Sequence, residues 1–228
     1  MNPRALTALQ TADWRMRVFS IYDEVRRLRS VDPAEAHEFW RVSRDDLFSM
    51  HPASPLLPED AAGFGGLPIA PYDPAWSFEV EIEDVADDDP RPRRFDFETG
   101  TDGVVPFELL GIARLDGVGT LDVWRLASYG GGLFVPVKDA RAGKPDGTYG
   151  GGRYLVDTIK GASLDHTVTL GVDADEAVAA RPTIVLDFNF AYNPSCAYDP
   201  AWACPLAQPG NRVATEIPVG EGYVGSVR

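Results

Sequence analysis

Glycines and polar residues suited to anion recognition follow one another in residues 149–157. Tyr149, Gly150, Gly151 and Gly152 directly precede Arg153, Tyr154 and Asp157. Successive backbone N–H groups in a glycine-rich segment can cradle an anion, and a neighbouring guanidinium can bind it in a bidentate manner. The alternative is a tight turn or β-bulge in a closed sheet. No Gly-Lys-Ser/Thr and no helix pattern follow, which excludes a P-loop and a dinucleotide fingerprint.

A second group of polar residues lies in the unusual stretch 186–211. Asp187 and Asn189 alternate with apolar residues, which places them side by side on one face of a predicted strand. Tyr192 and Asn193 follow, and a long irregular segment comes next. A structureless connection of about 20 residues in a compact domain is usually functional. The alternative is a loop packed by its own aromatic rings. Because residues 129–132 repeat the Tyr-Gly-Gly-Gly sequence, we expect 129–132, 149–152 and 187–193 to line one concave region.

These segments together predict a site for a small polar or anionic ligand. Arg153 would pair with an acidic group, Asp187 and Asn189 would hold polar groups, and Tyr149 or Tyr192 would stack. The expected residues are Tyr149, Gly150, Gly151, Gly152, Arg153, Tyr154, Asp157, Asp187, Asn189, Tyr192 and Asn193. Three alternatives stay open: an enzyme with His51 and Asp187 as acid and base, a barrel that holds a flavin, and a protein-interaction module that uses loop 190–211.

The histidines and cysteines carry weaker signals. His51 follows a predicted helix, where a cap and a general acid or base are both open interpretations, and His37 is expected to face solvent. Cys196 and Cys204 are separated by seven residues. We expect reduced thiols that bind no metal, against the alternatives of a loop disulfide, a metal site and a catalytic thiolate paired with His51.

The elements that position these residues form an α+β pattern. Apolar residues at helical spacing predict helices over 14–28 and 33–51, the second capped by Asp32 with Pro33 at its first position. Residues 52–74 read as a surface connection. Strands are predicted at 76–82, 95–97, 104–115, 121–126, 133–137, 153–159, 166–172, 183–190 and 212–219, with a hairpin around Asp116 and Gly117 and a short helix at 173–180.

The expected architecture is a single domain, residues 1–228. A helical segment, 1–51, would pack on an antiparallel β-barrel-like sheet within 52–228, because strands follow one another with almost no helix between them. Barrel and sandwich are not distinguished by this pattern.

Charge and composition limit the partners. The chain has 228 residues, with 35 acidic against 21 basic residues and a net charge of −14. Nucleic-acid binding needs clustered cations, so nucleic acid is not an expected partner, and neither is an anionic membrane. The sequence contains no run of about 18 apolar residues, so a membrane span is not expected. The N-terminus shows no apolar signal region, and a cytoplasmic location is therefore expected. Scattered acidity is typical of a solvated surface, with an acidic docking face as the alternative.

Several segments, taken in order, resemble a known family. They are HPASPL at 51–56, GGGLFVPVKD at 130–139, TYGGGRYL at 148–155, LDFNFAYNPSCAY at 186–198 and CPL at 204–206. The chain resembles the bacterial and archaeal family called domain of unknown function 1684. The resemblance implies that these segments belong to one folded unit and implies no activity or cofactor. Gly210 stands where this family leads us to expect an acid, and Arg141 with an insertion at 144–147 lengthens a loop.

Overall fold

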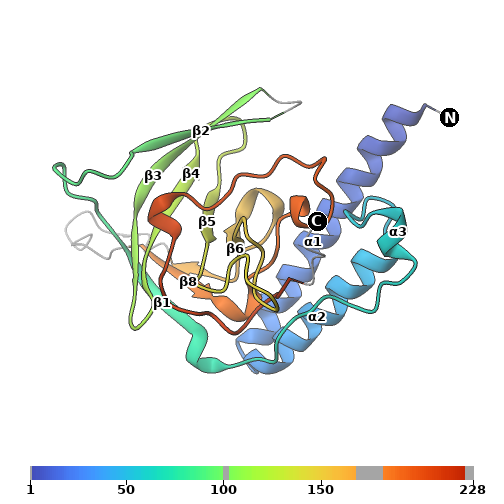
Figure 1. Ribbon diagram of the computed structural model, residues 1–228, viewed down its shortest axis with the longest axis horizontal. Helices are drawn as coiled ribbons and strands as arrows, with labels where there is room; N and C mark the ends of the chain where they lie inside the picture. Colours follow the sequence, from blue (N-terminus) through green and yellow to red (C-terminus); the bar gives the residue numbers. More distant parts are fainter. Residues whose placement is uncertain (1, 100–102, 168–181, 224–228) are drawn as a thin grey trace, which may run out of the picture.

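Two helices at the N-terminus lie side by side on one side of a curled sheet (Figure 1). The computed structural model describes residues 2–99, 103–167 and 182–223. Helix α1 spans Pro3–Arg29 and α2 spans Pro33–Met50. The Asp32 carboxylate accepts hydrogen bonds from the backbone N–H groups of Ala34 and Glu35, and α2 ends before Pro52. The predicted second helix, its cap and its end are thus confirmed.

An antiparallel sheet follows the helices. Its strands are β1 (Ser77–Glu83), β2 (Arg94–Glu98), β3 (Val104–Leu115), β4 (Gly119–Leu126), β5 (Leu133–Val137), β6 (Arg153–Asp157), β7 (His166–Thr167) and β8 (Thr183–Asp187). They pair in the order β6-β5-β4-β3-β1-β8-β7, and β2 pairs with β3. The sheet curls into a half-barrel, so the α+β class with helices packed on a barrel-like antiparallel sheet is confirmed.

Some predicted elements end early or are replaced. The strand expected at 183–190 stops at Asp187, because the Asp187 side chain accepts the Asn189 N–H and starts a 3₁₀ turn, Phe188–Phe190. The strand expected at 153–159 similarly gives way to a 3₁₀ turn at Thr158–Lys160. Residues 212–219 form no strand; within them, Arg212 makes an isolated bridge to Lys138. The connection 52–74 contains a short helix, α3 (Pro58–Ala61), and a 3₁₀ turn begins at Pro74.

Two predictions lie partly or wholly outside the described residues. The short helix expected at 173–180 lies outside them. The strand expected at 166–172 is described only as β7, His166–Thr167.

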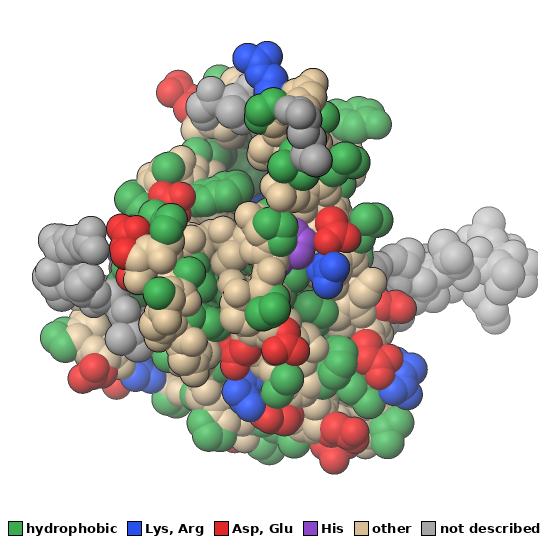
Figure 2. Space-filling view, turned by 90° about the vertical axis from the view of Figure 1, so that its right-hand side faces the viewer, with side chains coloured by type: hydrophobic (Ala, Val, Ile, Leu, Met, Phe, Trp, Pro, Cys, Tyr) green, Lys and Arg blue, Asp and Glu red, His purple; other side chains and the backbone are tan. Residues whose placement is uncertain are grey.

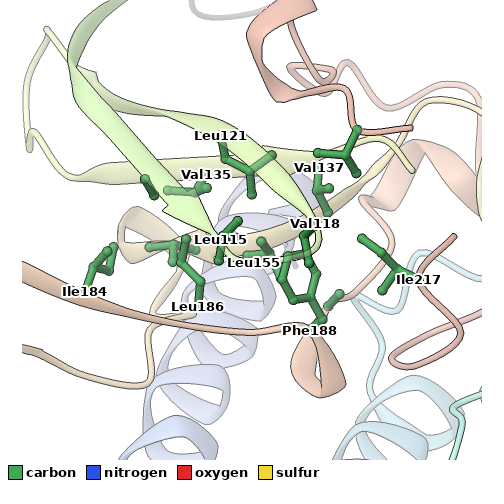
Figure 3. Packing of buried hydrophobic residues seen from close by; sticks show 14 of the residues in the cluster. Leu115, Val118, Leu121, Val135, Val137, Leu155, Ile184, Leu186, Phe188 and Ile217 are labelled. Atoms are coloured by element: carbon green, nitrogen blue, oxygen red, sulfur yellow. The ribbon is translucent and has the colours of Figure 1, made fainter. Parts of the chain in front are cut away.

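The hollow of the curled sheet is filled by apolar side chains. Leu115, Leu121, Val135, Leu155, Leu186 and Phe188 converge there, and Ile217 from the C-terminal segment closes the cluster (Figure 3). Alternation along β8 divides its side chains between two cores: Ile184 and Leu186 point into the hollow, whereas Val185 packs with Trp40 and Tyr22 of the helices. Because side chains fill the hollow, the structure gives no support to a flavin held inside the sheet.

Charged side chains are interspersed on the surface. Figure 2 shows acidic side chains scattered over the face that carries the helices, with basic ones among them. Among the described residues, no helix is both long and apolar enough to cross a membrane.

Candidate functional site

Residues 149–152, which we call the second glycine segment, form a tight turn directly before β6. The Gly152 N–H donates to the Tyr149 carbonyl at 2.9 Å, and Gly152 has a φ of +92°. A Cβ atom at position 152 would lie 2.7 Å from the carbonyl oxygen of Val137. Glycine is therefore required for this turn to pack against the end of β5, in agreement with the turn interpretation.

Arg153, the expected anion partner, is buried and bonded to protein groups. Its Nη2 donates to the Asp139 carboxylate at 3.0 Å, and its Nη1 donates to the Val219 carbonyl at 2.6 Å. Longer bonds reach the carbonyls of Ile217 and Glu221. Burial lowers the Arg153 pKa, and the negative charges of Asp139 and Glu221 oppose that effect. Arg153 thus fixes residues 217–221 in place, and both of its Nη atoms are bonded to protein groups.

A cleft of about 270 Å³ lies beside Arg153 and the residues that it binds. It is lined by residues 68–70, 146–148, 218–220 and 222–223, together with Arg141 and Arg153. Among the described residues, the Arg141 guanidinium makes one hydrogen bond, from Nη2 to the Asp146 carbonyl at 2.8 Å. The Tyr223 ring forms another part of the wall. The cleft therefore combines a partly exposed guanidinium, an aromatic ring and glycine backbone.

Most residues that line this cleft are not among the site residues expected from the sequence. Of the expected site residues, Arg153 lines it, whereas Arg141, Thr148 and Tyr223 were not predicted. The available signal was the lengthened loop, since Arg141 and the insertion 144–147 lie at the cleft. Asp139 also went unnoticed; it accepts the Thr148 hydroxyl at 2.6 Å and thereby connects the cleft wall to Arg153.

Asn193 holds a buried glutamate. The Glu221 carboxylate accepts hydrogen bonds from the Asn193 N–H at 3.1 Å, the Asn193 amide at 3.1 Å and Arg44 Nη2 at 2.7 Å. The Arg44 guanidinium lies 5.1 Å from the ring centres of Trp40, Phe48 and Tyr192. Burial raises the Glu221 pKa, and the Arg44 charge opposes the rise. Asn193 and Tyr192 thus anchor the C-terminal segment to α2.

Asp187 and Asn189 hold another chain segment. The Asn189 amide donates to Asp187 Oδ1 at 2.8 Å and to the Asp73 carbonyl at 2.9 Å, and its oxygen accepts the Asp73 N–H. Arg29 Nε lies 3.9 Å from Asp187 Oδ2, and burial raises the Asp187 pKa. These polar side chains connect the end of β8 to the chain that leads into β1.

His37 is buried, which corrects the expectation that it faces solvent. Its Nε2 lies 3.1 Å from the Asn189 carbonyl oxygen, and its ring contacts Trp40, Tyr72 and Phe190. The apolar stripe of α2 is covered by α1, and the 3₁₀ turn at Phe188–Phe190 covers the neighbouring face that carries His37. Burial lowers the His37 pKa, so the ring is neutral near pH 7.

His51 and Asp187 are not brought together. His51 Nε2 lies 3.0 Å from Asp13 Oδ2, and its Nδ1 accepts the Ala53 N–H. Asp187 neighbours Arg29, and Asp13 and Arg29 are separated by about 24 Å along α1 at a rise of about 1.5 Å per residue. The structure therefore gives no geometric support to an acid–base pair made of His51 and Asp187.

The two glycine segments also stay apart, and the expectation of one shared concave region is wrong. A Cβ atom at Gly132 would meet Thr158 and Ile159 beyond the end of β6, whereas Gly152 meets Val137 at the end of β5. Because β5 and β6 are antiparallel, these positions lie at opposite ends of the pair, about 17 Å apart for five residues of strand. Tyr129 is fully exposed.

The remaining expected residues gather around the cysteine loop. Tyr149 donates from its hydroxyl to the Cys196 carbonyl at 3.3 Å, and Tyr154 donates to the Pro205 carbonyl at 2.6 Å. The Tyr154 ring also packs edge-on against Tyr192. Asp157 pairs with Lys160, whose amino group lies over the Tyr154 ring. Tyr149 and Tyr154 therefore contact loop 190–211.

Cys196 and Cys204 are free thiols in the structure. The described residues hold no group of three or more His, Cys, Asp or Glu side chains arranged for a metal ion. Trp202 and Leu206 of the same loop are exposed, and the interaction-module hypothesis for 190–211 stays a prediction.

Gly210, in the 3₁₀ turn Pro209–Asn211, leaves room for a carboxylate from strand β4. A side chain at position 210 would collide with the Asp122 carboxylate of β4, which pairs with Arg91 at 2.7 Å. The buried Asp122 carboxylate thus occupies the space that an acidic side chain at position 210 would need.

Comparison with known proteins gives a family and a fold relative. The family described as Protein of unknown function (DUF1684) matches residues 62–222, which excludes the segment at 51–56. The solution NMR structure of an uncharacterised protein from Haloarcula marismortui is similar, at 31% sequence identity and a TM-score of 0.52, over 79% of this chain and 89% of that chain. The curated proteins gave no match. With most of its length matched, the chain belongs to the DUF1684 family.

Proposed function

We propose that this protein binds a small molecule carrying a carboxylate or phosphate group in the Arg141 cleft. We define this cleft by residues 68–70, 141, 146–148, 153, 218–220 and 222–223. The single observation that carries the proposal is the Arg141 guanidinium, which lines the cleft and makes one hydrogen bond within the described residues. In a chain with a net charge of −14, this guanidinium brings positive charge to a concave site. Planar guanidinium groups recognise carboxylates and phosphates in a bidentate manner.

Arg153 supports this site from beneath. Its hydrogen bonds to the carbonyls of Ile217, Val219 and Glu221 fix the wall formed by residues 218–222. A wall that is already ordered lowers the entropy cost of binding. The role first predicted for Arg153 thus passes to Arg141, and Arg153 positions the backbone.

The size of the cleft restricts the ligand. A volume of about 270 Å³ lies at the lower limit of pockets that hold drug-sized molecules, roughly 300 Å³. We therefore expect a ligand of a few heavy atoms around its acidic group, with an apolar part against Pro68, Ile69 and the Tyr223 ring.

A binding screen tests the proposal. Small mono- and dicarboxylates and phosphate monoesters are titrated into the protein by calorimetry at low salt. Arg141→Gln should weaken binding of any hit roughly 10- to 100-fold, because a hydrogen bond to a charged group contributes about 1.5–3 kcal/mol. Arg141→Lys should retain part of the affinity, since the charge stays and the bidentate geometry is lost.

Arg94→Gln is the matched control. Arg94 is an exposed arginine of β2 whose guanidinium pairs with Asp96. This variant should bind like the wild type. Equal affinity of the wild type and Arg141→Gln, or the absence of any binding anion in the screen, would reject the proposal.

A further inference from the structure

Cys196 and Cys204 meet in a small polar cluster beside the second glycine segment. The Cys196 N–H, in the 3₁₀ turn Ser195–Ala197, donates to the Cys204 sulfur at 3.4 Å. The Tyr149 hydroxyl lies 3.7 Å from the Cys196 sulfur. Cys204 is buried at 8% exposure, whereas Cys196 is half-buried. Each sulfur thus lies beside one hydrogen-bond donor, and Cys204 is the more deeply buried of the two residues.

The surroundings favour a thiolate at Cys204. The Cys196 thiol donates a hydrogen bond to it, which lowers the Cys204 pKa below its ordinary value. The backbone N–H groups of Cys196 and Ser195 and the charge of Lys160 act in the same direction, against burial. The same thiol–thiol hydrogen bond raises the Cys196 pKa, so that one thiol of the pair keeps its proton.

We propose that Cys196 and Cys204 form a reversible dithiol site that reacts with small hydroperoxides. This inference is independent of the Arg141 cleft. It rests on the contact between the Cys196 N–H and the Cys204 sulfur, and on the donors gathered around them. Low exposure at Cys204 restricts the oxidant to a small molecule such as hydrogen peroxide.

The chemistry proceeds in two steps. The Cys204 thiolate attacks one peroxide oxygen, so that an S–O bond forms, the O–O bond breaks, and the other oxygen leaves as water or an alcohol after taking a proton from solvent. The Cys196 thiol then attacks the sulfenic acid; an S–S bond forms, the S–O bond breaks, and the hydroxyl leaves with the Cys196 proton as water. Two thiols are oxidised and one peroxide is reduced. A thiol reductant restores the pair by disulfide exchange.

Intact mass and thiol titration of the wild type test the site directly. Treatment with one equivalent of hydrogen peroxide should remove both thiols and lower the mass of the monomer by 2 hydrogens, and dithiothreitol should reverse both changes. Since the chain has 2 cysteines, each thiol is identified by one variant. Cys196→Ser should stop at a sulfenic acid on Cys204, detected as a gain of one oxygen in the intact mass.

Cys204→Ser provides the comparison. Its peroxide consumption should fall at least roughly tenfold, because the variant lacks the Cys204 sulfur, on which the stabilising donors and the Lys160 charge act. The wild-type measurement needs no variant, so it decides even if a variant fails to fold. Disulfide-linked dimers, thiols that survive peroxide, or equal rates for Cys204→Ser and the wild type would overturn the proposal.

Discussion

The buried charged residues next to the Arg141 cleft hold the chain together. Glu221 is fully buried and bonds to Arg44 and Asn193, and Arg153 bonds to Asp139 and the C-terminal carbonyls. Buried ions need such partners, because an unpaired charge in the interior is costly. The residue types that suggested ligand recognition in the sequence are the same types that a buried ion network requires.

Glu221→Ala should strongly destabilise the fold. The substitution leaves the Arg44 guanidinium buried without its counter-charge, and breaking a buried pair costs about 3–5 kcal/mol. Glu216→Ala is the control, since Glu216 pairs with Lys144 on the surface and its loss costs no more than about 1 kcal/mol. Urea unfolding measures both variants. Similar losses for the two would contradict the network described for Glu221.

His37 should make stability depend on pH. Burial lowers its pKa below the value of about 6.5 expected in the unfolded chain, so the unfolded state binds the proton more tightly. The stability that neutral His37 contributes is therefore complete above about pH 6.5 and is lost as the pH falls below that value. The difference in unfolding free energy between wild type and His37→Gln should shrink from pH 7 to pH 5. A difference that stays constant would show that His37 is not buried as a neutral ring.

Elements that depend on neighbouring residues in the sequence were predictable. Segments that depend on side-chain contacts with distant residues were not. The cap at Asp32 and the Asp116–Gly117 hairpin follow from local residue types, and strand β5 occurs as predicted. Residues 212–219 alternate like a strand, yet Arg153 binds their carbonyls and takes the place of a strand partner. The cleft was missed for the same reason, because its wall depends on contacts between residues far apart in the chain.

The second glycine segment allows a controlled test at the level of elements. Gly152 and Gly130 have similar φ values, +92° and +95°, but a Cβ at 130 would meet nothing within 4 Å. Gly130→Ala should cost about 1–3 kcal/mol from backbone strain alone. Gly152→Ala should cost clearly more, because its Cβ also collides with the Val137 carbonyl. Thermal or urea unfolding that gives equal losses would refute the close packing of this turn.

At the scale of the whole molecule, the excess of negative charge destabilises the folded state through repulsion. A net charge of −14 is distributed over a chain whose exposed surface is 12772 Å². Molar KCl shortens the screening length to about 3 Å and removes most of this repulsion. The melting temperature should therefore rise from low salt to 1 M KCl. A flat or falling series would instead favour an acidic docking face.

The position of the ligand site is the central claim, and amide NMR measures it most directly. The anion with the highest affinity in the calorimetric screen is added to ¹⁵N-labelled protein, and amide shifts are followed through the titration. We predict that the largest shifts fall on Gly147, Thr148, Gly220, Gly222 and Tyr223, and that Arg141→Gln moves them to higher anion concentration. Shifts that concentrate in loop 190–211 or around residues 129–132, with the amides of the Arg141 cleft unchanged, would contradict the account.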